Sequence, residues 1–454
     1  RADALPDDHY RLAVLLQDAG DQRRAETHYR YALDTQSTPD AWLGLGNALR
    51  AQGRLSDAVD AYRQGLNTLG SARGPASVAL TNNLGGVLIE LEDYDGAESA
   101  YRDTVAADPN HVSAWSNLGL VHQRQTRFEE SAAAFKRALE ITPSDPRAAL
   151  AYGHARQLTG DLDAAESGFR DALAKLSPND PYATDLRGKL IGRLADVALR
   201  RQDAGGALAF CDEQLVQFPG DASTLAVAAI CANEADAIAR RDRLLAFDHL
   251  VLPYDVANVE RNGASLNQAL STYVVKHPSL DYAPDQHATR KGMHSGDLFV
   301  GDDDRLIAHL ADAIWDAAGQ FVARLAAWDA SHPTLTTRPP RSRLRIWGVV
   351  MRSGGHQIPH IHPAAWLSGV YYPQLPPFVA DQQNDNAQLG WIEFGRSPDE
   401  FFATRPMPTR TFRPQEGRMF LFPGYFYHRT IPFDADAERI SIAFDFVPGD
   451  ERAV

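Results

Sequence analysis

The sequence predicts a multidomain α + β protein, in which an all-α repeat solenoid precedes a double-stranded β-helix (jelly-roll) domain with flanking helices. Two observations predict this class: a spacing of 34 residues that recurs in the first half of the chain, and short apolar runs punctuated by glycine and proline in the last third. Helical periodicity fades near residue 235, so we expect domains over residues 1–235 and 236–454.

The solenoid is predicted from residue types that recur 34 positions apart. The recurring positions pair Leu84-Gly85 with Leu118-Gly119, Tyr101 with Phe135, and Pro109 with Pro143. The glycines allow the two helices of a unit to approach closely, the aromatic ring fills the space between units, and the proline ends the second helix. This pattern resembles the tetratricopeptide repeat, and we expect about six units over residues 6–220.

Two asparagines indicate what the solenoid could bind. Such solenoids present a concave surface that usually binds extended segments of other proteins. Asn83 and Asn117 stand directly before the Leu-Gly pairs, so they should stack on one inner face. An amide both donates and accepts, so it can bind a peptide backbone whatever the side chains. The pair resembles the asparagine ladder of the O-linked N-acetylglucosamine transferase; the alternative is that both are solvated groove residues.

The segment between the two parts predicts one strand and one long helix. Residues 244–254 form an apolar run that ends in Leu252-Pro253-Tyr254, which favours a strand entering the second domain. Residues 303–328 carry apolar side chains at helical spacing, so we expect a long amphipathic helix there.

Three histidines of the last third stand where a β domain would gather them. His360 and His362 precede the apolar run 366–372, and alternation along a strand would place both on one face. His428 follows another apolar run, residues 420–427. Three imidazoles of this kind would form a facial set that leaves positions of a metal ion open for a cosubstrate and oxygen.

An arginine and a serine follow at a spacing that suits carboxylate binding. Arg439 lies eleven residues after His428, and on a strand it would share a face with Ser441. A guanidinium beside a hydroxyl is well suited to bind a carboxylate. This combination resembles the Fe(II)/2-oxoglutarate-dependent oxygenases, and more narrowly the bacterial 2-oxoglutarate–Fe(II) oxygenases that often carry tetratricopeptide repeats. The similar stretches are residues 360–363, 367–372, 390–395, 421–423, 428–430 and 439–444.

The resemblance implies Fe(II), 2-oxoglutarate as cosubstrate, and O2. By the family pattern His360 and His428 would bind iron, whereas Arg439 and Ser441 would bind the distal carboxylate of 2-oxoglutarate. The implied reaction oxidises an unactivated C–H bond while 2-oxoglutarate becomes succinate.

Two further residues near the predicted strands are candidate contacts. Arg345 is a candidate second contact to the cosubstrate. His356, next to Gly354 and Gly355, is a candidate lid or substrate contact.

The third iron ligand departs from the superfamily pattern, which is His-x-Asp or His-x-Glu. His362 stands at the acid position and could complete a neutral triad of histidines. Alternatively Glu393, on the following strand, supplies the carboxylate. In a third alternative His362-Pro363-Ala364 is the true register, and alanine replaces the carboxylate as in the related halogenases. We favour the first alternative, with Glu393 near the site but not on the metal.

Composition excludes several classes of function. Acidic residues outnumber basic ones by 59 to 45, and the resulting net charge of −14 argues against nucleic-acid or anionic-membrane partners. Two cysteines are too few for a disulfide scaffold or a cysteine-rich zinc module. No apolar run approaches the roughly 20 residues that span a bilayer. We expect a cytoplasmic bacterial protein, with a removed targeting peptide as an open alternative because the sequence begins at Arg1.

These features together favour a protein or peptide hydroxylase, whose repeat groove captures the substrate. In one alternative the enzyme is a small-molecule oxygenase or halogenase, and the repeats serve docking or formation of a homodimer. In another, the β domain is a non-catalytic, cupin-like binding scaffold.

Overall fold

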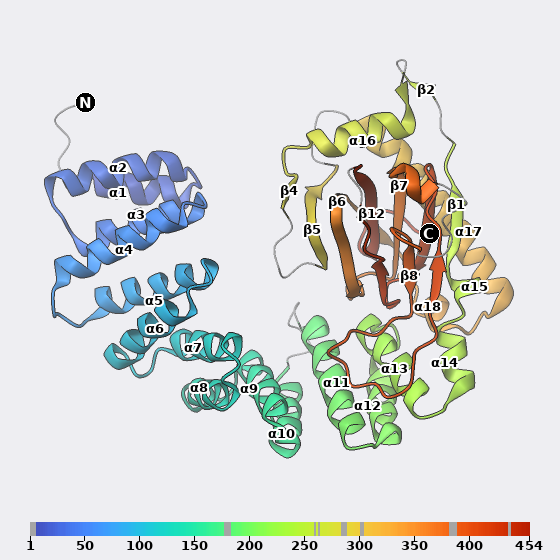
Figure 1. The fold of residues 1–454 in the computed structure, drawn as a ribbon, viewed down its shortest axis with the longest axis horizontal. Helices are drawn as coiled ribbons and strands as arrows, with labels where there is room; N and C mark the ends of the chain where they lie inside the picture. The colour runs from blue at the N-terminus through green and yellow to red at the C-terminus, as the bar shows by residue number, and fades with distance from the viewer. Residues whose placement is uncertain are drawn as a thin grey trace. The chain divides into compact units, whose positions relative to one another are not determined.

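The computed structural model describes residues 6–176, 183–257, 260–261, 264–282, 288–299, 304–380, 388–434 and 437–454. The chain forms two compact units, Arg1–Ser177 and Pro178–Val454 (Figure 1). The sequence placed a boundary at residue 235 from helical periodicity alone. The compact units divide earlier because the helices that follow residue 182 pack with the β strands. In the described part of the chain, no helix combines the length and apolar character needed to cross a bilayer.

The first unit is a run of helices in which each packs on its neighbour in the chain. These are α1 (Pro6–Asp18), α2 (Gln22–Thr35), α3 (Pro39–Ala51), α4 (Leu55–Leu69), α5 (Pro75–Glu90), α6 (Tyr94–Ala107), α7 (Val112–Arg124), α8 (Phe128–Ile141), α9 (Pro146–Thr159) and α10 (Leu162–Ala174). Local sequence starts several of them: Asp21, Asp93 and Asp161 accept a backbone N–H at the beginning of α2, α6 and α10. The predicted helical solenoid is therefore confirmed.

The repeat glycines mark the closest approach of paired helices. A Cβ placed on Gly85 would lie 2.8 Å from the ring of Tyr101, and one on Gly119 would lie 2.9 Å from the ring of Phe135. Both rings are buried. No side chain fits at these distances without a shift of the ring, so the helix spacing depends on glycine.

The second unit begins with helices that carry on the repeat pattern. They are α11 (Ala183–Arg200), α12 (Ala204–Gln217), α13 (Ala222–Glu234), α14 (Ile238–Leu244) and α15 (Phe247–Leu250). Helix α13 is buried on every side from Ala222 to Asn233, as expected of a helix enclosed by its neighbours. The expected sixth repeat thus corresponds to α11 and α12, which belong to the second unit.

Hydrogen bonds tie these helices to the strand-rich region. The backbone N–H of Phe402 donates to Asp196 of α11 over 2.6 Å, and that of Arg405 donates to Glu234 of α13 over 2.8 Å. The hydroxyl of Tyr425 donates to the carbonyl of Leu244 over 2.8 Å. The segment that contains Phe402 and Arg405 is the red loop that crosses α11–α13 in Figure 1.

A curled, ten-stranded antiparallel sheet forms the rest of the unit, in the order β1-β10-β7-β12-β6-β11-β8-β9; β5 also pairs with β6, and β4 pairs with β5. The strands are β1 (Leu252–Asp255), β4 (Asp281–Tyr282), β5 (Thr289–Asp297), β6 (Ser342–His360), β7 (Leu367–Gln374), β8 (Ile392–Phe394), β9 (Arg410–Phe412), β10 (Arg418–Pro423), β11 (His428–Thr430) and β12 (Arg439–Pro448). Strand β6 pairs with β12 along its first half and with β11 near its end. The class of the domain is as expected, and the jelly-roll closure stays a prediction.

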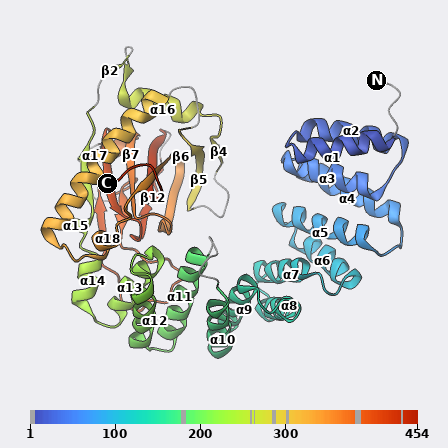
Figure 2. The same ribbon diagram turned by 180° about the vertical axis from the view of Figure 1, so that it is seen from behind.

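The remaining elements support this sheet. A small hairpin joins β2 (Glu260–Arg261) and β3 (Ala264–Ser265), and the helices are α16 (Leu266–Lys276), α17 (Asp304–Trp328), α18 (Pro333–Thr336) and α19 (Pro377–Ala380). Helix α16 packs on β7 and α17 on β10, so the two cover one face of the sheet (Figure 2). The long helix expected at 303–328 is confirmed. The strand expected at 244–254 forms only from residue 252, because α14 and α15 take up the preceding residues.

Candidate metal centre

Three imidazoles meet where β6 and β11 pair. His360 ends β6, His428 begins β11, and the two residues are direct partners across the strands. His362 follows two residues after His360. Their ring centroids lie 4.2 Å (His360–His428), 5.1 Å (His362–His428) and 5.4 Å (His360–His362) apart. One ligand nitrogen from each ring lies within 4.8 Å of the others, which suits a single metal ion.

Each ring is oriented by a partner at Nδ1. The Nδ1 of His360 lies 2.9 Å from the carbonyl oxygen of Ile358, and that of His428 lies 2.9 Å from the carbonyl oxygen of Phe426. The Nδ1 of His362 lies 2.5 Å from Oδ1 of Asp445. An acceptor at Nδ1 places the ring proton there and leaves the Nε2 lone pair for a metal.

Two of the imidazoles are held in the neutral form that binds metals. Desolvation in the cavity, with a smaller contribution from His362, lowers the pKa of His360 to about 3. Desolvation and the neighbouring histidines likewise lower the pKa of His428 well below its usual value. Both side chains therefore present lone pairs at neutral pH, and no proton has to leave before a metal binds.

A cavity of about 140 Å³ lies between these rings and β12. Its lining combines His360, His362 and His428 with Arg439 and Ser441, so the structure brings all five predicted residues together. Arginine and serine reach the same space because alternation along β12 turns both inward.

Arg439 is a buried cation with no carboxylate partner in the described part of the chain. Its side chain is 2 % exposed, and its Nη1 donates to Ser441 Oγ over a long 3.4 Å. Its Nε makes no hydrogen bond of ordinary geometry within the described residues. The guanidinium carbon lies 5.0 Å from the ring centre of Tyr372 on β7, and the two side chains interact, although the contact falls outside ordinary hydrogen-bond geometry.

An unpaired guanidinium at this depth is costly unless an anion meets it. Desolvation lowers the pKa of Arg439. A guanidinium in a protein nevertheless keeps its positive charge at neutral pH. The donors therefore fit the carboxylate of a cosubstrate, and the three imidazoles fit a divalent metal ion.

Glu393, the alternative third ligand, lies outside this cavity. Ile392 lines the cavity and Glu393 does not, as expected for adjacent residues of β8 that face opposite ways. Its carboxylate accepts from Arg396 over 2.8 Å and from Arg429 over 2.5 Å. Burial opposes ionisation, but these two arginines outweigh it and hold the pKa of Glu393 below its usual value.

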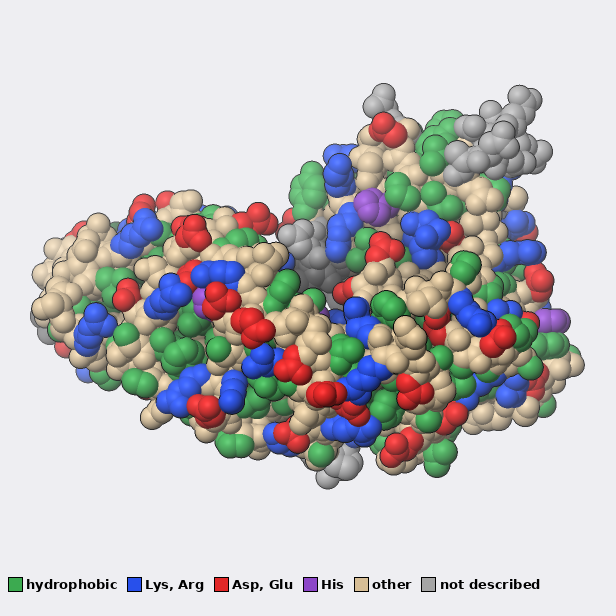
Figure 3. All heavy atoms as spheres, turned by 60° about the horizontal axis from the view of Figure 1, so that its bottom comes forward, with side chains coloured by type: hydrophobic (Ala, Val, Ile, Leu, Met, Phe, Trp, Pro, Cys, Tyr) green, Lys and Arg blue, Asp and Glu red, His purple; other side chains and the backbone are tan. Residues whose placement is uncertain are grey.

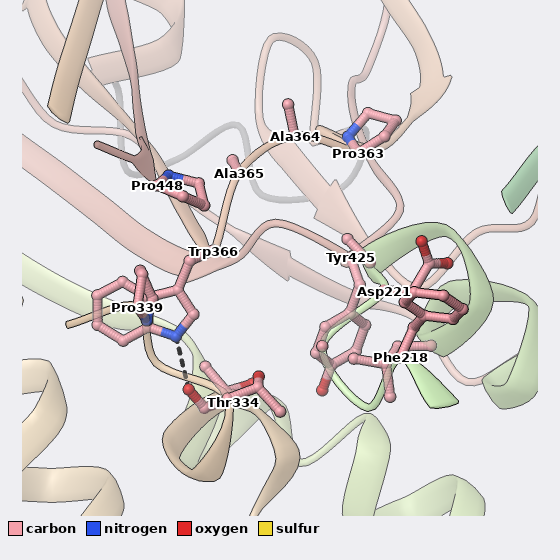
Figure 4. Close-up of a pocket in the computed structure, with 14 residues that line it drawn as sticks. Phe218, Asp221, Thr334, Pro339, Pro363, Ala364, Ala365, Trp366, Tyr425 and Pro448 are labelled. Atoms are coloured by element: carbon pink, nitrogen blue, oxygen red, sulfur yellow. Dashed lines mark hydrogen bonds between the residues drawn. The ribbon is translucent and has the colours of Figure 1, made fainter. Parts of the chain in front are cut away.

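Ala364, the alanine of the halogenase alternative, also lies elsewhere. It lines an apolar hollow of about 320 Å³ together with Pro363, Trp366 and Tyr425 (Figure 4). None of the three histidines lines this hollow. The indole N–H of Trp366 donates to the carbonyl of Thr334 over 2.6 Å, which fixes that wall.

Two further predicted contacts lie beside the cavity. Arg345 is exposed and lines a neighbouring recess of about 300 Å³ with Asp297 and Asp445, and the recess shares Trp347 with the cavity. His356 is half-buried, and its Nδ1 lies 3.1 Å from the carbonyl oxygen of Gly354. Neither Arg345 nor His356 lines the cavity itself.

The two predicted groove asparagines have partners within the repeats. The amide of Asn83 donates to Asn47 Oδ1 over 2.8 Å, and its side chain also interacts with the hydroxyl of Tyr62. Asn117 interacts in the same way with the hydroxyl of Tyr101. Both side chains are half-buried, so part of each amide stays accessible.

The sequence prediction missed Asp445 and Tyr372. Alternation along β12 from Arg439 through Ser441 would have placed Asp445 on the same face. No local pattern marks Tyr372, which approaches Arg439 because β7 pairs with β12.

Comparison with known proteins agrees with this site. Residues 345–445 match the family described as "Putative 2OG-Fe(II) oxygenase", and residues 10–78, 82–146 and 117–181 match the tetratricopeptide repeat. The chain therefore carries tetratricopeptide repeats and, over residues 345–445, a domain of the 2OG-Fe(II) oxygenase family. That family implies Fe(II), 2-oxoglutarate and O2, and the three histidines lie close enough to bind the iron.

Similar individual proteins match only in part. The chain is 33% identical over 106 residues to protein O-mannosyl-transferase Tmtc1 of Drosophila melanogaster, which covers 23% of this chain and 12% of that protein. It is 31% identical over 156 residues to cytochrome c-type biogenesis protein CycH of Rhizobium meliloti, covering 32% and 39%. The chain thus spans well under half the length of these relatives. Among solved structures, a tetratricopeptide repeat protein from Parabacteroides merdae has 18% identity and a TM-score of 0.39, covering 54% of this chain and 90% of that chain.

Proposed function

We propose that the protein is an Fe(II)- and 2-oxoglutarate-dependent hydroxylase that acts on a protein or peptide substrate captured by its repeats. The observation that carries the proposal is the convergence in one cavity of three imidazoles and a buried guanidinium that has no carboxylate partner among the described residues. A metal ion and a dicarboxylate are the two ligands that these groups would satisfy together.

His360, His362 and His428 would hold the iron through their Nε2 atoms. Three ligands from one side leave the remaining positions for the cosubstrate and O2. When bound, iron with 2-oxoglutarate and O2 supplies the oxidation: one oxygen atom goes to succinate, the other becomes the substrate hydroxyl, and CO2 leaves.

The chain's own residues would bind and orient the cosubstrate. Arg439 would donate to the distal carboxylate of 2-oxoglutarate, and Ser441 would donate a further hydrogen bond to it. Because both lie on the rigid β12, the opposite end of the cosubstrate would point toward the histidines. Apolar side chains of Phe422, Val349 and Ile392 line the same cavity and would limit the access of water.

The repeats support a polypeptide substrate. Tetratricopeptide solenoids commonly bind extended segments of other chains, and Asn83 and Asn117 retain accessible amides for a peptide backbone. On the face drawn in Figure 3, acidic and basic side chains are interspersed. The net charge of −14 nevertheless favours a basic partner at long range.

The test uses the full chain, Fe(II), 2-oxoglutarate and a library of peptides under air. We expect succinate formation that depends on both cofactors, together with a peptide product heavier by one oxygen atom. His428→Ala should abolish both signals. Asn83→Ala combined with Asn117→Ala should reduce peptide oxidation while it leaves 2-oxoglutarate binding unchanged. Peptide oxidation that is unaffected by this double change would contradict the role of the repeats.

A small-molecule substrate is the second candidate, and the recess beside the cavity favours it. Its volume of about 300 Å³ and its mixed lining of Arg345, Asp297 and Ser295 suit a polar metabolite. If the enzyme oxidises a metabolite and peptides do not inhibit that oxidation, this candidate would be favoured over the first.

A further inference from the structure

Asp445 makes a contact with the metal centre that the oxygenase resemblance does not assign. Its Oδ1 lies 2.5 Å from Nδ1 of His362, and the same oxygen accepts from the hydroxyl of Ser368 over 2.7 Å. The two side chains of the pair are 12 % (His362) and 14 % (Asp445) exposed, so solvent screens their interaction only weakly.

The sheet holds this carboxylate in place. Asp445 shares the inward face of β12 with Arg439 and Ser441, and it is the direct cross-strand partner of Ser368 on β7. Ser368 is fully buried, so its hydroxyl has one fixed direction in which to donate. The carboxylate is therefore preorganised to accept from the imidazole, as expected of a group that orients a metal ligand.

His362 is distinguished from the other two histidines by this partner. His360 and His428 meet neutral backbone carbonyls at Nδ1, whereas His362 meets a charged carboxylate. A charge-assisted hydrogen bond of this kind raises the electron density on the imidazole and makes its Nε2 a stronger ligand. His362 also occupies the position at which the superfamily pattern places an acidic ligand.

We infer that Asp445 supplies, through His362, the negative charge that a carboxylate ligand would supply directly, and that it is a positioning residue of the iron site. The inference rests on the proposed binding of iron by the three histidines. Asp445 keeps the proton of His362 on Nδ1, turns Nε2 toward the metal, and partly offsets the charge of a divalent ion. A triad that is neutral by ligand type thereby gains one charge from its immediate surroundings.

The test compares the wild-type full chain with Asp445→Asn. Asparagine keeps the size and the acceptor oxygen and removes only the charge. Anaerobic competition with a chromophoric chelator measures the affinities for Fe(II) and Co(II), and the absorption spectrum of the Co(II) form reports on the ligand field. We expect the affinity to fall by about 10- to 100-fold and the Co(II) bands to shift. An affinity within twofold of wild type with an unchanged spectrum would overturn the inference.

Asp297→Asn is the matched control. Asp297 also lines the neighbouring recess, and its carboxylate accepts a hydrogen bond from the backbone N–H of Phe299 over 3.1 Å. We expect its metal affinity to stay within twofold of wild type. An equal loss in both variants would mean that any nearby negative charge suffices, and the specific role of Asp445 would be refuted.

A double-mutant cycle separates action through His362 from a structural role. If Asp445 acts through His362, Asp445→Asn should cause no further loss of metal affinity in a His362→Ala background. Additive losses would overturn the inference, and thermal unfolding of each metal-free variant shows whether the fold persists. These readouts need neither substrate nor turnover. Absence of metal binding by the wild type would refute the proposed function, whereas equal binding by the wild type and Asp445→Asn would refute only this inference.

Discussion

Replacing Arg439 should weaken the binding of 2-oxoglutarate but should not lower the stability of the ligand-free chain. Arg439→Met removes a guanidinium that is 2 % exposed and replaces it with an apolar side chain that can occupy similar space. Among the described residues its partners are neutral hydroxyls, Ser441 at a long 3.4 Å and Tyr372, so they compensate little of the charge. The variant should therefore bind 2-oxoglutarate poorly and yet be at least as stable as the wild type in the absence of ligand.

The magnitudes follow from burial. Loss of one partner from a buried, hydrogen-bonded charge pair costs about 2–4 kcal/mol, so the dissociation constant for 2-oxoglutarate should rise by roughly 30- to 700-fold. Replacing an uncompensated buried charge with an apolar group should raise the free energy of unfolding of the ligand-free chain by about 1–3 kcal/mol.

The assay is anaerobic calorimetry of 2-oxoglutarate binding to the metal-loaded chain, together with urea unfolding without ligand. Arg345→Met is the control, because Arg345 is exposed and lines the recess outside the cavity. We expect its affinity for 2-oxoglutarate to change less than threefold. An Arg439→Met variant that binds within threefold of wild type would refute the reasoning, and a large loss in Arg345→Met would return the cosubstrate contact to Arg345.

Three further predictions concern packing, titration and the third ligand. Gly85→Ala should lower the free energy of unfolding by about 1–3 kcal/mol, because its Cβ would lie 2.8 Å from the ring of Tyr101. Gly86→Ala, whose Cβ would have its nearest contact at 3.5 Å, should be neutral or stabilising. Urea unfolding of both variants tests this difference. Burial lowers the pKa of His332 to about 4 in the folded chain, whereas in the unfolded chain it is about 6.5. Between these two values the unfolded chain binds more protons than the folded one. The free energy of unfolding should therefore fall as the pH drops from about 6.5 to 4, by up to about 1.4 kcal/mol per pH unit. His332→Asn, which keeps an acceptor at the helix start, should flatten that slope in urea unfolding from pH 7 to pH 4, and an unchanged slope would contradict the assignment. Glu393→Gln should lower the melting temperature and leave Fe(II) affinity within threefold, since its carboxylate is bound to arginines; a loss of iron binding would instead make Glu393 the ligand.

Local sequence was sufficient to predict the structure wherever the geometry of a position permits only one kind of residue. The repeat glycines and the aromatic rings they contact were predictable, because close helix approach excludes other residues. The inward placement of His360, and of Arg439 with Ser441, followed from strand alternation. The convergence of distant residues in one cavity needed the sheet order, which only the resemblance supplied in advance.

Sequence was insufficient to predict the structure where contacts between distant segments decide which element forms or where it packs. Residues 244–254 are apolar, and such a short run suits a helix as well as a strand; α15 forms there because it packs against α17. The placement of α11–α14 in the second unit depends on contacts with residues some two hundred positions away, such as Phe402 with Asp196. The partners of Glu393 and Asp445 likewise come from other strands.

The most direct test of the central claim is a crystal structure of the full chain with Fe(II) and 2-oxoglutarate, prepared without oxygen. We predict one iron ion bound by His360, His362 and His428 through Nε2, with Asp445 on Nδ1 of His362 and the distal carboxylate of 2-oxoglutarate on Arg439. Iron bound by Glu393, or 2-oxoglutarate bound away from Arg439, would contradict the account.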